Sequence, residues 1–273
     1  MLKGIYQHFF SQETPLEVIF EKSKKAGFDA VELALNRPGM QGVTPETTAK
    51  EARQIKQLAD HHGLQLRSFM FAGGMFGARD ASVREKGVEL FRRQLEVAEA
   101  LGVDTMLVVP GRVDAEHRYD EVYKRSQEEL SKLVRDVENS RIHLAVENVW
   151  NNFLLSPLEF ARYVDELNSP YVGVYFDVGN ILKYGLPEHW IRILDHRIRK
   201  VHLKDFKVRP GGHEGFVPLL AGDVNWTEVM KALRDIGYND VLTAEVAPYT
   251  HIPEQSLYDL ARHIDVIITG EPK

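Results

Sequence analysis

Four polar side chains stand at the ends of short apolar runs in the second half of the chain, and their types suit a metal ion. Three are carboxylates and one is an imidazole: Glu147, Asp177, His202 and Glu245. If the runs are neighbouring strands, the three carboxylates repel one another and cannot all stay ionised unaided. A divalent cation removes that repulsion, and oxygen ligands with one imidazole nitrogen suit Mn²⁺, Mg²⁺ or Co²⁺ better than a thiolate-seeking ion. Four protein ligands leave about two octahedral positions open for adjacent oxygen atoms of a substrate.

The elements that would bring these side chains together follow from an alternation of short β-type runs with longer amphipathic stretches. Eight runs have strand character, at residues 3–6, 30–35, 65–71, 105–109, 142–148, 172–177, 200–204 and 241–246. Eight successive β–α units predict a closed parallel (β/α)8 TIM barrel that forms a single domain over residues 1–273. An open, doubly wound sheet is the alternative architecture. Active sites of the barrel lie at the C-terminal ends of its strands, which is where the four side chains stand.

The amino-acid composition argues against several classes of function. The chain has 273 residues, with 34 Lys+Arg against 40 Asp+Glu, and its net charge of −6 argues against nonspecific nucleic-acid binding. It has no cysteine, which excludes disulfides, thiolate metal sites and a cysteine nucleophile. No run approaches the roughly 18 apolar residues of a membrane span, and the beginning of the chain lacks the apolar core of a signal peptide. We therefore expect a cytoplasmic protein that binds neither nucleic acid nor membranes.

The strand ends also carry a family resemblance. The chain resembles the sugar isomerase/epimerase branch of the xylose-isomerase-like barrels in four segments: Val146-Glu147-Asn148, Phe176-Asp177-Val178-Gly179-Asn180, Val201-His202-Leu203-Lys204-Asp205 and Ala244-Glu245. Within that branch it is most similar to the ketose 3-epimerases and L-xylulose-5-phosphate 3-epimerases. The resemblance implies that the four ligand positions bind one divalent ion, with Mn²⁺ expected before Mg²⁺ or Co²⁺. It also implies that Glu147 and Glu245 are the catalytic acid and base beside the reacting carbon.

The implied activity is epimerisation or isomerisation of a ketose or ketose phosphate through a metal-stabilised cis-enediolate. A metal ion that bridges the carbonyl and a neighbouring hydroxyl stabilises negative charge as a proton leaves the adjacent carbon. Return of a proton to the opposite face inverts that carbon, whereas return to the neighbouring carbon interconverts aldose and ketose. A metal-dependent dehydratase or lyase, acting on a keto-sugar or an oxidised glycoside, would use the same first step and stays open as the alternative.

Two further functions fit the sequence less well. An apurinic-site endonuclease on the same barrel would need additional histidines, where this chain has Arg67-Ser68-Phe69, Val109-Pro110-Gly111 and Asn180. A catalytically silent binding protein would be expected to lose a ligand or a glutamate, and all four positions are present. The expected partner is therefore a small sugar or sugar phosphate. A homo-oligomer, either a dimer or a tetramer, stays open.

Two candidate substrate contacts lie close to the predicted ligands. Lys204 shares the inward face of His202, and it either binds a substrate hydroxyl or pairs with a carboxylate such as Asp177 or Glu147. Asn180 either contacts substrate or forms a turn. Its place in an Asp-x-Gly-Asn segment is closer to the phosphate branch than to the epimerases of free ketoses, which often have histidine there.

Four more candidates lie farther along the rim. Trp150 follows the fifth run and either contacts the sugar or packs internally. Tyr6 lies on the first run, and we expect it to line the pocket together with His8 and Glu32 from the first two runs. Arg209 and His213 follow the seventh run together with Lys207, at a position where barrels often bind phosphate. The alternative for this last group is a solvated basic loop.

Overall fold

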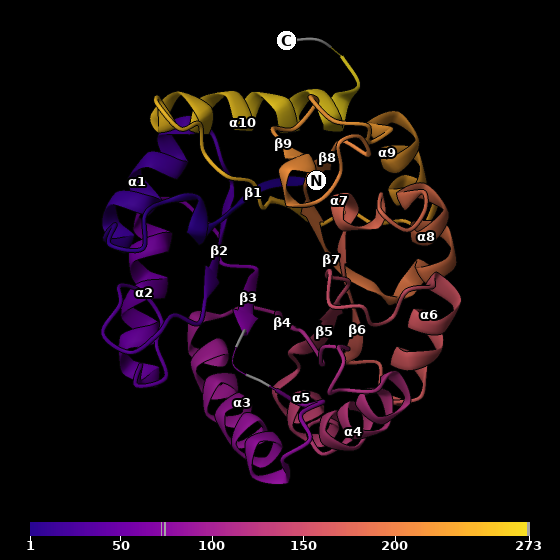
Figure 1. The fold of residues 1–273 in the computed structure, drawn as a ribbon. Coiled ribbons are helices and arrows are strands. Elements are labelled where there is room, and N and C mark those ends of the chain that lie inside the picture. Colours follow the sequence, from indigo (N-terminus) through magenta and orange to yellow (C-terminus); the bar gives the residue numbers. More distant parts are fainter. Residues whose placement is uncertain (72, 74, 272–273) are drawn as a thin grey trace.

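The computed structural model describes residues 1–71, 73 and 75–271, and a closed barrel of eight parallel strands forms its centre (Figure 1). Around the barrel the strand order is β1-β10-β7-β6-β5-β4-β3-β2. The strands are β1 (Leu2–Tyr6), β2 (Ala30–Ala34), β3 (Ser68–Phe71), β4 (Thr105–Val108), β5 (His143–Glu147), β6 (Val172–Asp177), β7 (Ile198–Leu203) and β10 (Val241–Ala244). The predicted TIM barrel is therefore confirmed, and the open-sheet alternative is wrong.

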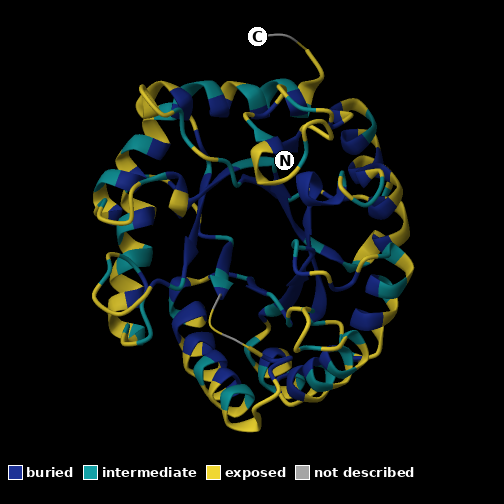
Figure 2. Cartoon of the chain, viewed as in Figure 1, coloured by how far each residue is buried: buried dark blue, intermediate teal, exposed yellow. Residues whose placement is uncertain are grey.

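Helices surround the strands as an outer ring, which completes a single (β/α)8 domain (Figure 1). Their inner faces are buried and their outer faces are exposed (Figure 2). The α-helices are α1 (Leu16–Ala26), α2 (Ala49–His61), α3 (Ala81–Leu101), α4 (Tyr119–Ser131), α5 (Val134–Ser140), α6 (Pro157–Asp165), α7 (Val178–Ile181), α8 (Pro187–Leu194), α9 (Trp226–Asp235) and α10 (Pro253–Thr269). Short 3-10 turns are η1 (Gln7–Phe9), η2 (Asp195–Arg197) and η3 (His213–Gly215).

Local sequence sets where several helices begin and end. Helix α2 begins after Thr48, whose hydroxyl accepts from the backbone of Glu51 while the Glu51 carboxylate accepts from the Thr48 backbone. This reciprocal pair satisfies two of the amide groups that a helix N-terminus leaves without partners. Helices α1 and α3 end at Gly27 and Gly102, with φ of 96° and 72°. Glycine adopts this left-handed conformation without the cost of a Cβ clash, so the chain can turn toward the next strand.

The interior of the barrel is apolar near its middle and polar toward the C-terminal ends of the strands. Leu107, Ala145 and Tyr175 form a small buried cluster inside the barrel, separate from the large core between strands and helices. Side chains alternate along a strand, so Glu147 projects to the same side of β5 as Ala145. The pleat therefore directs this carboxylate to the inside of the barrel.

A short hairpin extends the chain beyond β7, in a segment that we expected to be a loop. Its strands are β8 (Asp205–Phe206) and β9 (Phe216–Val217), which pair antiparallel. Asp205 anchors the segment because its buried carboxylate accepts hydrogen bonds from the backbone of Leu220 and Val224 and from the indole of Trp226. Among the described residues, no helix is long and apolar enough to cross a membrane.

Candidate active site

The barrel brings the four predicted metal ligands together at the C-terminal ends of its strands. Glu147 and Asp177 are the last residues of β5 and β6, His202 lies in β7 and Glu245 directly follows β10. One ligand atom from each of the four side chains lies within 4.8 Å of the others. Three of these residues are buried, and Glu245 is partly exposed. Strands β5, β6, β7 and β10 are successive neighbours in the barrel and run parallel. Their C-terminal ends therefore lie side by side and bring the four side chains together.

The contacts within this cluster suit a divalent cation. The Nδ1 atom of His202 lies 2.8 Å from Oε1 of Glu147 and 3.0 Å from Oε2 of Glu245. Two buried oxygens, Oδ2 of Asp177 and Oε2 of Glu245, make ion pairs with Lys204 but no well-aligned hydrogen bond with the described residues. Buried carboxylate oxygens with an imidazole nitrogen beside them form a donor set that fits Mn²⁺, Mg²⁺ or Co²⁺.

Lys204 supplies the positive charge that partly balances the carboxylates. Its Nζ lies 2.9 Å from Oδ2 of Asp177 and 2.9 Å from Oε2 of Glu245. Lys204 therefore pairs with carboxylates, as one of our two alternatives expected. Its partners are Asp177, which we named, and Glu245 in place of Glu147. The backbone of α7 lies directly against this lysine, since a Cβ on Gly179 would lie 2.6 Å from the Cβ of Lys204.

The environments of the two glutamates differ. Burial raises the pKa of Glu147 to about 7, although contact with His202 opposes this shift. Burial would also raise the pKa of Glu245, but the charges of Lys204 and His202 lower it to about 2. Burial alone would lower the pKa of His202, whereas the carboxylates of Glu32 and Glu245 raise it well above its ordinary value. Two carboxyl groups with different proton affinities beside one cluster are suited to serve as acid and base.

Asn180 belongs to an amide network that fixes the end of β6. Its side chain donates to the carbonyl of Asn148 at 3.0 Å, and its backbone donates to Oδ1 of Asp177 at 2.8 Å. The side chain of Asn148 in turn exchanges two hydrogen bonds with the backbone of Asp177. These contacts orient Asp177 toward the cluster and occupy the amide group that we considered as a substrate contact.

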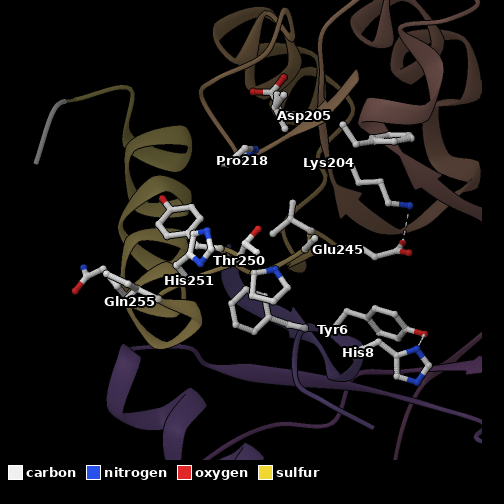
Figure 3. Close-up of a pocket in the computed structure, with 17 residues that line it drawn as sticks. Tyr6, His8, Lys204, Asp205, Pro218, Glu245, Thr250, His251 and Gln255 are labelled. Carbon is white, nitrogen blue, oxygen red and sulfur yellow. Dashed lines mark hydrogen bonds and ion pairs between the residues drawn. The ribbon is translucent and has the colours of Figure 1, made fainter. Parts of the chain in front are cut away.

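A cleft of about 920 Å³ opens beside the cluster. Tyr6 and His8 line one wall, and Lys204 and Glu245 line the inner end (Figure 3). The hydroxyl of Tyr6 lies 3.0 Å from Nδ1 of His8. Residues of the β8–β9 hairpin with Pro218, and residues between β10 and α10 such as Thr250, also line the cleft (Figure 3). The structure thus places Tyr6 where the sequence analysis expected it, within reach of a molecule bound beside Glu245.

Three of the rim residues predicted from the sequence do not line this cleft: Trp150, Arg209 and His213. Trp150 donates its indole hydrogen to the carbonyl of Asn180 at 3.0 Å, and its ring packs against Phe216 with centroids 4.9 Å apart. Arg209 and His213 are exposed in the connection between β8 and β9. The structure therefore does not bring these two basic side chains to the ligand cluster.

Glu32 was expected only to line the pocket, but it lies buried beneath the cluster. Its Oε1 accepts from Nε2 of His202 at 2.7 Å, and its Oε2 accepts from the hydroxyl groups of Ser68 and Tyr175. The separation of 170 residues between Glu32 and His202 leaves no local spacing that could signal the contact. The only signal in the sequence was a glutamate within the second apolar run, where its side chain could face the barrel interior.

A protein-family model described as "Xylose isomerase-like TIM barrel" matches residues 20–265, which is most of the chain. The chain belongs to the xylose isomerase-like TIM barrel family. The resemblance found in the strand-end segments is thereby confirmed. SgbU from Escherichia coli strain K12, provisionally named an L-ribulose-5-phosphate 3-epimerase, is 26% identical over 251 residues, which cover 89% of this chain and 87% of that protein.

Solved structures share the fold over almost the whole chain. A D-psicose 3-epimerase crystallised in the presence of D-fructose superposes with a TM-score of 0.81 at 19% identity, covering 99% of this chain and 100% of the other. The IolI protein with a bound zinc atom also gives a TM-score of 0.81 at 19% identity, and the match covers 99% of each chain. Relatives named as 3-epimerases of a ketose and of a ketose phosphate match the branch of the family that the segments resemble.

Proposed function

We propose that this protein is a divalent-metal-dependent epimerase or isomerase of a ketose or ketose phosphate. The observation that carries the proposal is that Glu147 and Glu245, from strands separated by β6 and β7 in the barrel order, both reach Nδ1 of His202. Inversion of a carbon needs an acid and a base on its opposite faces, and two glutamates on separate strands beside one cluster can supply that pair. The sugar-epimerase names of the family relatives support this assignment.

Glu147, Asp177, His202 and Glu245 would hold the ion, for which we propose Mn²⁺ first. When bound, a divalent ion would polarise a substrate carbonyl and offset the charge that develops on oxygen. The zinc atom bound by IolI supports a metal site in this fold. We also place the protein in the cytoplasm.

The two glutamates would carry the proton transfers. One glutamate, as a carboxylate, would accept a proton from the carbon beside the carbonyl and leave an enediolate. The other, as a carboxylic acid, would give a proton to the opposite face. The reverse reaction exchanges these roles. Lys204, whose Nζ lies at the inner end of the cleft, would stabilise negative charge on a substrate oxygen.

The cleft supplies the groups that would bind the rest of the sugar. Tyr6 and His8 offer a hydroxyl and an imidazole to sugar hydroxyls along one wall. We keep Trp150 and Asn180 as residues that would shape the rim of the site, and Arg209 and His213 as a proposed contact for a phosphate group. Because the relatives are named epimerases, we favour return of the proton over elimination of a leaving group.

A substrate panel in deuterated water tests the proposal. The Mn²⁺-loaded protein is incubated with free and phosphorylated pentuloses and hexuloses, and NMR follows deuterium incorporation beside the carbonyl and the appearance of the epimer or isomer. We expect one sugar class to exchange and to form product. Absence of exchange across the panel would reject the proposed activity, and formation of an unsaturated product would show a dehydratase or lyase.

A further inference from the structure

A buried carboxylate that the proposed proton transfers do not use lies directly behind the ligand cluster. Glu32 is 2% exposed, and His202, which it contacts, is 0% exposed. Its two oxygens have separate partners: Oε1 accepts from Nε2 of His202 at 2.7 Å, and Oε2 accepts from the hydroxyls of Ser68 and Tyr175. A buried carboxylate is costly unless its oxygens are hydrogen-bonded, and every contact here serves that requirement.

The position of Glu32 in the barrel makes this contact long-range. Strand β2 is separated from β7 by β1 and β10 in the barrel order, so the carboxylate reaches His202 across the interior. The ring of Tyr175 lies against the imidazole, with centroids 4.3 Å apart at an interplanar angle of 45°. The imidazole is thus restrained at one nitrogen by Glu32 and on one face by Tyr175.

These restraints determine which nitrogen faces the cluster. The 2.7 Å contact between Nε2 and Oε1 of Glu32 is a hydrogen bond when Nε2 carries the hydrogen and donates it. The other nitrogen, Nδ1, points toward Glu147 and Glu245. A histidine that ligates a metal through one nitrogen commonly donates from the other to a carboxylate, which fixes the ring orientation and raises the basicity of the ligand.

We propose that Glu32 is a positioning residue of the metal centre, which holds His202 with Nδ1 directed to the ion while Ser68 and Tyr175 hold Glu32 itself. This inference rests on the proposed metal-dependent function. Loss of such an outer contact typically weakens metal binding by about 10–100-fold. The expected effect is therefore on the affinity for the ion itself, which a purely structural role for Glu32 would leave unchanged in a folded variant.

The test measures Mn²⁺ affinity of the metal-free full-length protein by isothermal titration calorimetry, with thermal unfolding recorded for each variant. E32L removes both the charge and the acceptor, and we expect Mn²⁺ to bind it about 100-fold more weakly than wild type. E32Q keeps an acceptor of the same shape for His202, and we expect a loss of about 10-fold. If E32L does not fold, E32Q decides the question.

Glu129 provides the matched control, because it is also a buried glutamate, 3% exposed, but pairs with Arg84 and Lys132 far from the cluster in the fold. E129Q is expected to unfold at a lower temperature and to bind Mn²⁺ as wild type does. Wild-type Mn²⁺ affinity in a folded Glu32 variant would overturn the role of Glu32 and leave the proposed function standing. An equal loss of Mn²⁺ affinity in E129Q would do the same. Failure of wild type to bind any of Mn²⁺, Mg²⁺ and Co²⁺ would overturn both this inference and the proposed function.

Discussion

Lys204 Nζ lies 2.9 Å from Oε2 of Glu245 at the inner end of the cleft. The side chain of Lys204 is 17% exposed, so solvent screens this ion pair only weakly. A fixed positive charge beside a proposed acid–base glutamate could stabilise an oxyanion of the substrate.

Replacing Lys204 with methionine is expected to reduce kcat/KM by about 10²-fold, because a preorganised charge at a developing oxyanion typically contributes this much. K183M is a matched control, since Lys183 is exposed and its Nζ lies 4.6 Å from the centroid of the Trp150 ring, outside the lining of the cleft. Steady-state kinetics at saturating Mn²⁺ give kcat/KM for K204M and K183M relative to wild type. Equal activity of K204M and K183M would remove Lys204 from the reaction.

Metal removal is expected to abolish activity and to lower thermal stability. Asp177, Glu147 and Glu245 lie close together, so an ion that binds only the folded cluster stabilises the fold by mass action. Treatment with EDTA followed by dialysis should inactivate the protein, and Mn²⁺ should restore both the activity and the melting temperature. Full activity in a sample shown by elemental analysis to be metal-free would contradict the proposed cofactor.

The connection between β8 and β9 offers a test of phosphate recognition. Arg209 is exposed there and does not line the cleft. If Arg209 and the neighbouring His213 hold the phosphate group as proposed, R209A should lower kcat/KM for a phosphorylated ketose far more than for its free sugar. Equal changes for the two substrates would remove this connection from phosphate recognition.

A second charge network lies at the opposite end of the barrel and makes a prediction about stability. Lys200, whose side chain is 3% exposed, lies 2.6 Å from a carboxylate oxygen of both Asp104 and Asp240, and Arg67 contacts the same two residues. Burial would raise the pKa of Asp240, but the charges of Lys200 and Arg67 lower it. D240N should therefore reduce the free energy of unfolding by about 1–3 kcal/mol near neutral pH.

The pH dependence of that effect has a defined sign. The pKa of Asp240 is lower in the folded state than in the unfolded state, where it is about 3.9. The stabilisation by Asp240 is therefore fully present above the unfolded-state pKa and is lost as the pH falls through the folded-state pKa. Urea unfolding of wild type and D240N should differ at neutral pH and converge in acid. D120N, at an exposed pair with Arg118, should change little. A difference between wild type and D240N that is constant with pH would contradict this assignment.

The barrel and its ligand cluster could be predicted because both depend on local patterns. Short apolar runs placed the strands, and the side-chain period of two placed Glu147 and Asp177 on the inward face. Parallel strands of a closed barrel end at the same rim, so the convergence of these residues with His202 followed from the fold class alone.

The features that the sequence did not reveal depend on contacts between distant segments. The pairing of Glu32 with His202 crosses the barrel and has no local signature. The β8–β9 hairpin has strands of only two residues, too short for a periodic pattern, and is fixed by the buried carboxylate of Asp205. The amide of Asn180 could equally have faced a substrate until the structure showed it bound to Asn148.

The acid–base roles of Glu147 and Glu245 are the central claim. Their substitution by glutamine removes the proton-transfer group while keeping the size of each side chain, and E129Q serves as the matched control elsewhere in the fold. The most direct measurement is solvent deuterium incorporation beside the substrate carbonyl, made with Mn²⁺ occupancy verified for each protein. The account predicts losses of about 10²–10⁴-fold in E147Q and in E245Q, with exchange retained in E129Q. Exchange at the wild-type rate in both E147Q and E245Q would contradict it.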